Sequence, residues 1–163
     1  MSATEASSPN SRRQAWLAVL ARAPRADLEA ALAQACDGAA PPAYEWLRAP
    51  EIGLAMVRGR IGGTGDPFNL GEATVTRATL RLTGVAGSDG AAPVGVAWHL
   101  GRDKRRAELA ALADAMLQVP ERHAALNAQL IEPLAARIAA QREARRQDAA
   151  STRVEFFTMV RGD

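Results

Sequence analysis

The chain has 163 residues, of which 48% are apolar and 23% are charged, and its formal net charge is +2 at pH 7. This length and composition predict one globular domain with its own core and exclude an intrinsically disordered chain. The small, interspersed charge indicates no nucleic-acid-binding surface and no polybasic membrane patch. All but one of the basic residues are Arg, the side chain suited to bidentate contacts with phosphate or carboxylate.

Cysteine content and the N-terminal segment indicate the compartment. Cys36 is the single cysteine, so we expect no disulfide framework, no cysteine-based metal site and a reducing, cytoplasmic location. Residues 1–11 are polar and lack the apolar core of a secretory signal, and no apolar run reaches the length of a membrane span. We expect residues 1–11 to be a disordered leader and residues 12–163 to form a single domain.

Two short helices are predicted first. Residues 12–23 carry apolar side chains at helical spacing and end at Pro24, and in residues 25–38 the apolar positions recur at i, i+3, i+4 and i+7 before Gly38, a typical C-terminal stop. Residues 39–50 then predict a proline-bounded connector. Its aromatic residues, Tyr44 and Trp46, are expected to fill a core edge or an interface.

Three strands and a glycine-rich stretch follow. Apolar residues alternate with others in residues 52–60, 72–82 and 94–100, which predicts an antiparallel meander. Between the first two strands, glycine, proline and asparagine residues lie close together in the sequence. Several glycines together indicate positive φ angles or a close backbone approach, so this stretch predicts a long loop with a defined conformation. The residues are Gly59, Gly62, Gly63, Gly65, Pro67, Asn69 and Gly71.

This loop has two interpretations. Arg58, Arg60, Thr64 and Asn69 lie beside backbone N–H groups that no side chain hinders, an arrangement that suits an anion. In the alternative, the stretch is a long hairpin connection whose glycines only make turns. It matches neither a P-loop nor a dinucleotide-binding fingerprint.

A second candidate anion site follows the third strand. Asp103 is a natural N-cap for a helix whose apolar face includes Leu109 and Met116, and it lies between the cations Arg102 and Lys104. Cations at a helix N-terminus oppose the helix dipole, so they indicate either an acidic ligand or partner, or simple surface solvation. Both readings remain open at this point.

The C-terminal third predicts a long helix and a last strand. Residues 120–150 have helical spacing, with Pro133 placed to kink or divide the helix. Residues 152–161 alternate and are apolar on both faces in the middle, so we expect a fourth strand that is central or covered by another chain. The complete pattern predicts an α+β fold: a four-stranded, largely antiparallel sheet packed with about four helices.

The sequence contains no readable catalytic constellation. Its two histidines are far apart, and it contains no HExxH motif, no cysteine cluster and no G-x-S-x-G nucleophile elbow. Catalytic residues are therefore unknown at this stage, and we expect no metal in this chain.

Three blocks, RGRIGGTGDPFNLGE, HLGRDKRRAELAALAD and VEFFTMVRGD, closely resemble the PhnG family, the G subunit of the bacterial carbon-phosphorus lyase core complex. The resemblance extends over about residues 12–163. It implies an accessory role, with the H, I and L proteins, in transferring the ribose triphosphate of ATP to methylphosphonate with release of adenine. It implies partners as well: the H, I and J subunits and the ATP-binding-cassette-like K and L proteins.

The resemblance further implies that this chain holds no cofactor. ATP is then a substrate of the whole complex, and the iron-sulfur cluster and S-adenosylmethionine belong to the J subunit. No catalytic residue of the family is carried over to this chain. Two roles follow for it: a structural subunit, or a contributor of phosphate contacts through Arg58, Arg60, Thr64 and the junction from Arg102 to Lys104.

Overall fold

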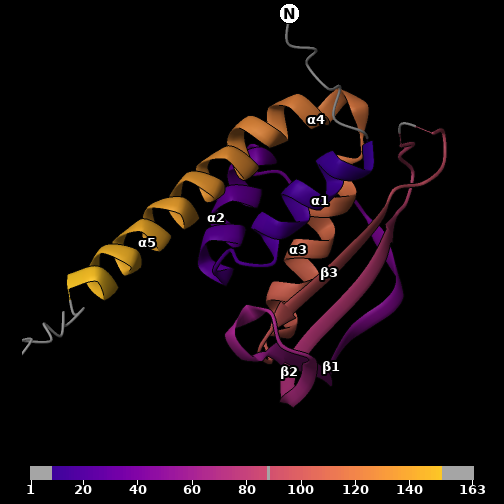
Figure 1. Cartoon of the computed structure of the whole chain (residues 1–163). Coiled ribbons are helices and arrows are strands. Elements are labelled where there is room, and N and C mark those ends of the chain that lie inside the picture. Colours follow the sequence, from indigo (N-terminus) through magenta and orange to yellow (C-terminus); the bar gives the residue numbers. More distant parts are fainter. Residues whose placement is uncertain (1–8, 88, 152–163) are drawn as a thin grey trace, which may run out of the picture.

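The computed structural model describes residues 9–87 and 89–151 and has an α+β architecture, in which helices cover one face of an antiparallel sheet (Figure 1). The sheet has three strands in the order β1-β2-β3. The elements are α1 (Pro9–Leu20), α2 (Arg25–Ala35), β1 (Tyr44–Arg60), the 3-10 turn η1 (Ile61–Gly63), β2 (Pro67–Leu82), β3 (Val94–Leu100), α3 (Lys104–Leu117), α4 (Pro120–Leu126), the π-helical turn η2 (Asn127–Ile131) and α5 (Glu132–Ser151). The predicted class and antiparallel pairing are confirmed, while the predicted fourth strand, residues 152–161, lies outside the described residues.

α2 ends close to its predicted glycine stop, whereas α1 ends at Leu20, before the predicted end at residue 23. After α2, the N–H of Gly38 donates to the carbonyl of Ala33 at 3.0 Å, and Gly38 has a φ of +73°. The residue before it, Asp37, is already left-handed with a φ of +51°, and its N–H donates to the carbonyl of Gln34 at 3.1 Å, so an aspartate occupies the position that glycine usually takes after a helix and Gly38 follows it. At the other end α1 begins at Pro9, so it includes the last residues of the predicted leader.

β1 begins earlier than predicted, and the predicted connector over residues 39–50 is wrong in its second half. Tyr44 pairs with Leu82 and Trp46 with Leu80, so the aromatic residues already belong to the sheet. Pro50 is tolerated because the ladder shifts register between Arg48 and Glu51, and because β1 is an edge strand with one side free of ladder hydrogen bonds.

α3 is the centre of the core. It packs on β2 and β3 with one side and on α2 and α4 with the other, and residues 109–117 are all buried. A helix that is apolar nearly all round is typical of such a position between layers. Asp103 caps its N-terminus as predicted, since its Oδ1 accepts a hydrogen bond from the N–H of Arg106 at 2.9 Å.

α3 and β3 approach each other most closely at Gly95. A Cβ atom added there would lie 1.9 Å from the carbonyl oxygen of Ala111 and 2.8 Å from the backbone nitrogen of Ala115. Only glycine therefore allows this separation between the helix and the sheet.

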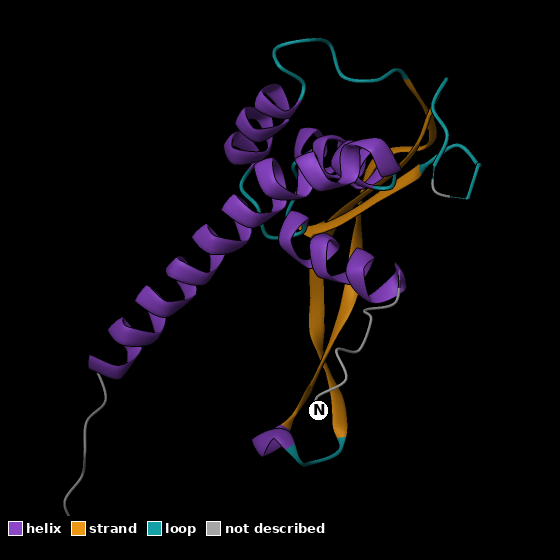
Figure 2. Cartoon of the chain, turned by 90° about the horizontal axis from the view of Figure 1, so that it is seen from above, coloured by secondary structure: helices purple, strands orange, loops and turns teal. Residues whose placement is uncertain are grey.

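The C-terminal helical region is divided near Pro133, as predicted. Proline has no N–H for the carbonyl of Gln129, and the helix widens there into the π-helical turn η2 before α5 begins. α5 then extends away from the sheet (Figures 1 and 2), and residues 139–151 are all exposed. Across the described ranges, no helix combines the length and apolar character that a membrane span requires.

Candidate functional site

The outer half of the β1–β2 hairpin stands apart from the core. β2 pairs with β3 from Val75 to Arg81, whereas from Pro67 to Thr74 it pairs with β1 alone. We call residues 54–74 the hairpin arm. Figure 2 shows the arm extending beyond the helices to its tip at η1. It is therefore a two-stranded ribbon, and no layer formed by the described residues packs on either face.

The hairpin arm exposes large apolar side chains. Ile61 is 77% exposed at the tip, and Leu54 and Leu70 are 64% and 62% exposed on the strands. A ribbon of two strands cannot bury apolar residues on its own, and contiguous exposed apolar surface of this kind marks interaction sites in soluble proteins. The full apolar set is Leu54, Met56, Val57, Ile61, Phe68 and Leu70.

A β-bulge arranges these side chains on the two faces of the arm. Val57 pairs with Gly71 and Arg58 with Asn69, so Leu70 is an extra residue in β2. Gly71, with a φ of +146°, supplies the backbone conformation that this irregularity needs. A Cβ added at Gly59 would meet the Cδ1 of Leu70 at 2.7 Å, so Leu70 lies across this glycine.

The bulge consequently groups the apolar residues. Val57, Phe68 and Leu70 share one face of the arm, because Phe68 pairs with Gly59 and Leu70 covers it, whereas Leu54 and Met56 lie on the other. Without the extra residue, Phe68 would lie on the face opposite to Val57. Both faces therefore offer apolar contacts.

The predicted glycine-rich loop is much shorter than expected. Only residues 61–66 leave the ladder, whereas Arg58, Arg60 and Asn69 lie within the strands. β1 and β2 thus form a hairpin with a short connection, and the predicted long loop is wrong in length; anion binding by this stretch stays a prediction. The tip is held by the guanidinium of Arg60, which donates to the carbonyl of Gly65 at 3.2 Å, and by the N–H of Gly65, which donates to the carbonyl of Ile61 at 3.1 Å.

The structure divides the predicted anion-contact residues into two groups. Arg58, Arg60, Thr64 and Asn69 are all exposed near the end of the arm. The exposed Arg102 and Lys104 instead follow β3, where the N–H of Gly101 donates to the carbonyl of Thr74. Thr74 and Asn69 are five strand residues apart, or about 17 Å at ~3.4 Å per residue. One anion of phosphate size does not bridge that separation, and contact of either group with an anion stays a prediction.

Close to the Arg102–Lys104 turn lie one buried polar side chain, His99, and one partly buried side chain, Arg106. His99 on β3 is 5% exposed, and within the described part of the chain neither of its ring nitrogens, nor Nε of Arg106, has a hydrogen-bond partner. Burial lowers the pKa of His99, and the nearby charge of Arg106 lowers it further. A general base has to reach its substrate, and His99 is shielded by the sheet and α3, so the neutral imidazole is placed for packing rather than for proton transfer.

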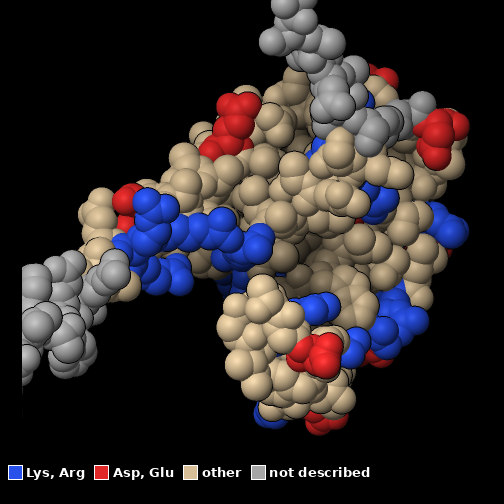
Figure 3. Space-filling model, viewed as in Figure 1, with Lys and Arg blue, Asp and Glu red and all other residues tan. Residues whose placement is uncertain are grey.

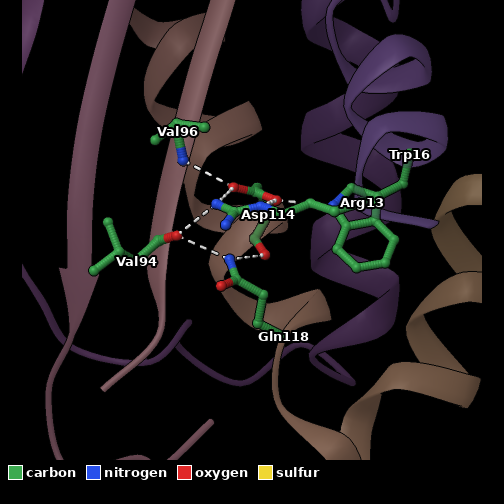
Figure 4. Close-up of polar contacts among 6 residues, drawn as sticks. All are labelled: Arg13, Trp16, Val94, Val96, Asp114 and Gln118. Carbon is green, nitrogen blue, oxygen red and sulfur yellow. Dashed lines mark hydrogen bonds and ion pairs between the residues drawn. The ribbon is translucent and has the colours of Figure 1, made fainter. Parts of the chain in front are cut away.

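The most highly connected polar residue is Asp114, which the sequence analysis did not single out. Its carboxylate is fully buried, and Figure 4 shows it between α1, α3 and β3. It accepts hydrogen bonds from Nη2 of Arg13 at 2.7 Å, Nε1 of Trp16 at 2.8 Å and the N–H of Val96 at 2.9 Å. A sequence signal existed: Asp114 interrupts the apolar run ALADAML of a helix, where an unpaired carboxylate would be costly.

These contacts give Asp114 a structural role, since all of its partners belong to the chain itself. In residues 9–87 and 89–151 no group of three or more His, Cys, Asp or Glu side chains lies close enough to hold a metal ion. The most exposed apolar feature of the described surface is the hairpin arm, which has arginines near its end. Figure 3 shows that the surface over this end of the molecule is mainly uncharged, while Lys and Arg gather along α5.

Comparison with known proteins shows similarity over most of the chain. A family model described as "Phosphonate metabolism protein PhnG" matches residues 11–162. A relative from Rhizobium meliloti (strain 1021), described as "Alpha-D-ribose 1-methylphosphonate 5-triphosphate synthase subunit PhnG", is 46% identical over 152 residues, which are 93% of this chain and 90% of the relative.

Proposed function

Because this chain belongs to the PhnG family of phosphonate metabolism proteins, we propose that it is the PhnG subunit of an α-D-ribose 1-methylphosphonate 5-triphosphate synthase. In this proposal the enzyme transfers the ribose triphosphate of ATP to methylphosphonate and releases adenine. The chain acts in this reaction with the H, I and L proteins. Its assembly includes the H, I and J subunits, and the ATP-binding-cassette-like K and L proteins are further partners. It carries no cofactor of its own, and the iron-sulfur cluster and S-adenosylmethionine belong to the J subunit.

The hairpin arm supports a structural role for the chain within that enzyme. Stable interfaces have an apolar centre with a polar rim, and the arm combines apolar residues on both faces with arginines near its tip. Among the described residues nothing packs on these faces. We propose that the arm docks into another subunit, with Leu54, Met56, Phe68 and Leu70 at the centre of the contact and Arg58 and Arg60 at its rim.

Replacing Leu54 and Leu70 with serine is expected to break this contact without unfolding the chain. Both side chains are largely exposed, so the fold loses little, whereas apolar anchors at the centre of an interface contribute about 2 kcal/mol or more in total. Association with the I subunit should weaken at least tenfold, as measured by co-purification and titration. Adenine release from ATP with methylphosphonate should fall with it.

The matched control is Leu47→Ser, because Leu47 is also exposed on β1, at 46%, but lies outside the arm. This variant should associate normally. A Leu54→Ser/Leu70→Ser subunit that assembles and supports adenine release at the wild-type level would contradict docking through the arm.

A second candidate role is direct contact with the phosphates in a shared active site. Arg58 and Arg60 are exposed, and within the described ranges neither forms an ion pair with Asp66 or Glu72. Arg60 uses one N–H for the carbonyl of Gly65, and its other donors and the guanidinium of Arg58 can bind an anion or a partner carboxylate.

The double substitution Arg58→Ala/Arg60→Ala tests this role. If the arginines contact phosphate, each charge-assisted contact is worth roughly 1.5 to 3 kcal/mol, so adenine release should fall by about one to two decades while the melting temperature of the subunit is unchanged. Arg145→Ala on the exposed part of α5 is the control. Unchanged adenine release in an intact assembly would remove the arginines from the transfer step, whereas disassembly would assign them to subunit contact.

A further inference from the structure

The two edge strands of the sheet, β1 and β3, differ in how their outer edges are closed. Side chains close the start of β3, because Arg13 and Gln118 donate to the carbonyl of Val94 and the N–H of Val96 donates to Asp114. Among the described residues, no side chain bonds to the backbone of residues 51–57 of β1. Soluble proteins usually protect such an edge, since a row of unpaired N–H and C=O groups is a template for another strand.

The alternation of the ladder shows which groups of β1 are unpaired. β2 bonds to β3 through its even-numbered residues, as the bond from the N–H of Gly101 to the carbonyl of Thr74 shows, so its odd-numbered residues bond to β1. Within residues 51–57, odd-numbered residues of β1 lie opposite odd-numbered residues of β2. The backbone groups of the even-numbered residues therefore point outward, and nothing in the described ranges pairs with them. These residues are Ile52, Leu54 and Met56.

Residues 51–57 are also the regular part of this edge. The register shifts just before them, between Arg48 and Glu51, and again at their end, between Val57 and Arg58. Residues 52–57 contain neither a charged residue nor a proline, the two residue types that most often block pairing at an edge. The result is a short, flat, unprotected edge whose middle residue is Leu54.

We propose that residues 51–57 pair antiparallel with the same residues of a second copy of this chain, about a two-fold axis at Leu54. In this register Leu54 lies opposite Leu54 of the second copy, and Ile52 lies opposite its Met56. Each such pair exchanges two hydrogen bonds, so every outward N–H and C=O group of these residues gains a partner. A contact that is self-complementary in this way is what a two-fold dimer requires.

The side chains fit the same register. Ile52, Leu54 and Met56 are 43%, 64% and 54% exposed and share one face of the strand. Pairing makes them cross-strand neighbours of the same side chains in the second copy, and their removal from water favours association. The single charged residue of the segment, Glu51, lies opposite Val57 of the second copy, so no like charges meet across the contact.

This pairing is independent of the docking proposed above, because it uses the edge of the hairpin arm whereas docking uses its faces. Seven residues from each strand form a small contact next to the ~800 Å² per partner of a standard interface. We therefore expect a dimer that dissociates on dilution. The measurements below use the full chain without other subunits, so their outcome does not depend on whether the arm docks into another protein.

Cysteine cross-linking tests the register. In a Cys36→Ser background, Leu54→Cys places the new thiol opposite its own copy, because the Cα atoms of a hydrogen-bonded pair lie ~5.5 Å apart, within reach of a disulfide. The control is Leu70→Cys, which is similarly exposed on β2 but lies at least three strand spacings, or ~14 Å, from its copy. Leu54→Cys should oxidise to a covalent dimer at least about tenfold faster than this control. Equal rates would overturn the proposal.

Amide hydrogen exchange of the wild-type chain at several protein concentrations supplies a second measurement. The amides of Ile52, Leu54 and Met56 should exchange at least about tenfold more slowly at high concentration than after dilution, whereas those of α3 stay protected throughout. Protection that does not change with concentration, or that appears only after other subunits are added, would overturn the proposal. A different segment or a different protein would then cover the edge.

Two variants at one position separate backbone pairing from side-chain contact. Leu54→Pro removes an outward N–H and leaves the bonds between β1 and β2 in place, whereas Leu54→Ala loses the same side chain but keeps the N–H. By sedimentation, the dimer of Leu54→Pro should be at least about tenfold weaker than that of Leu54→Ala, with α3 equally protected in both. Equal association of the two variants would overturn pairing through this edge.

Discussion

A Gly95→Ala chain is expected not to reach the native fold. The added methyl group would lie 1.9 Å from the carbonyl oxygen of Ala111. No rotamer can relieve this contact, because the backbone fixes the position of Cβ and the oxygen is itself a backbone atom. Inserting atoms into a packed core costs about 1 to 3 kcal/mol and occasionally more, and here α3 would have to move off the sheet. We expect a cost above about 3 kcal/mol, a large share of the 5 to 15 kcal/mol that stabilises a typical domain.

The measurement is soluble yield together with the urea midpoint of any folded fraction. Gly53→Ala is the control, because a Cβ at Gly53 meets no atom within 4 Å and the residue lies in β1. That variant should unfold at or above the wild-type midpoint, since alanine restricts the unfolded chain. A Gly95→Ala midpoint equal to that of Gly53→Ala would show that α3 and β3 do not approach as closely as described.

Asp114→Ala is expected to produce the second large loss of stability. It leaves Arg13, which is 33% exposed, without its ion pair, and it leaves the indole N–H of Trp16 and the N–H of Val96 without an acceptor. Removing one member of a buried, hydrogen-bonded pair costs about 3 to 5 kcal/mol. For a domain of this size, the melting temperature should fall by roughly 6 to 20 °C.

Two variants distinguish the effect of losing the Asp114 hydrogen bonds from the effect of losing a negative charge. Glu29→Ala removes an exposed carboxylate that pairs with Arg25, so the melting temperature should barely change. Asp114→Asn keeps the shape and one acceptor oxygen, so its loss should lie between those of Asp114→Ala and the wild type. If Asp114→Ala unfolds at the same temperature as Glu29→Ala, the carboxylate does not tie α1 to β3.

Sequence reasoning succeeded where the deciding interaction is local. Asp103 and Gly38 make their hydrogen bonds within about one turn of the helices that they begin and end. The strand at residues 94–100 was predicted from the alternation of side chains within that segment alone. The division of the C-terminal helix follows from the missing N–H of Pro133 in the same way. Each of these features could be predicted because no distant residue takes part in it.

Sequence reasoning failed where a residue distant in the chain decides the structure. The prolines and glycines of residues 39–50 and 58–72 indicate loops, but the pairing of β1 with β2 includes Pro50, Gly59, Pro67 and Gly71 in strands, with irregularities at Pro50 and Gly71. Asp114 is buried because of Arg13 and Trp16, about a hundred residues away. The two candidate anion sites were expected to contribute together to a shared active site, yet strand geometry separates Asn69 from the turn at Arg102.

The hairpin arm has a consequence for the motions of the free subunit. Among the described residues, neither a third strand nor a helix covers its ladder, and its large apolar side chains are already 40 to 77% exposed, so opening it exposes much less new apolar surface than opening the core. The arm can therefore separate and reclose at a small fraction of the free energy needed to unfold the core around α3. A partner that holds the arm in one conformation gains the contact energy minus the conformational entropy that the arm loses, so the rigidity of this ribbon sets how tightly the subunit binds.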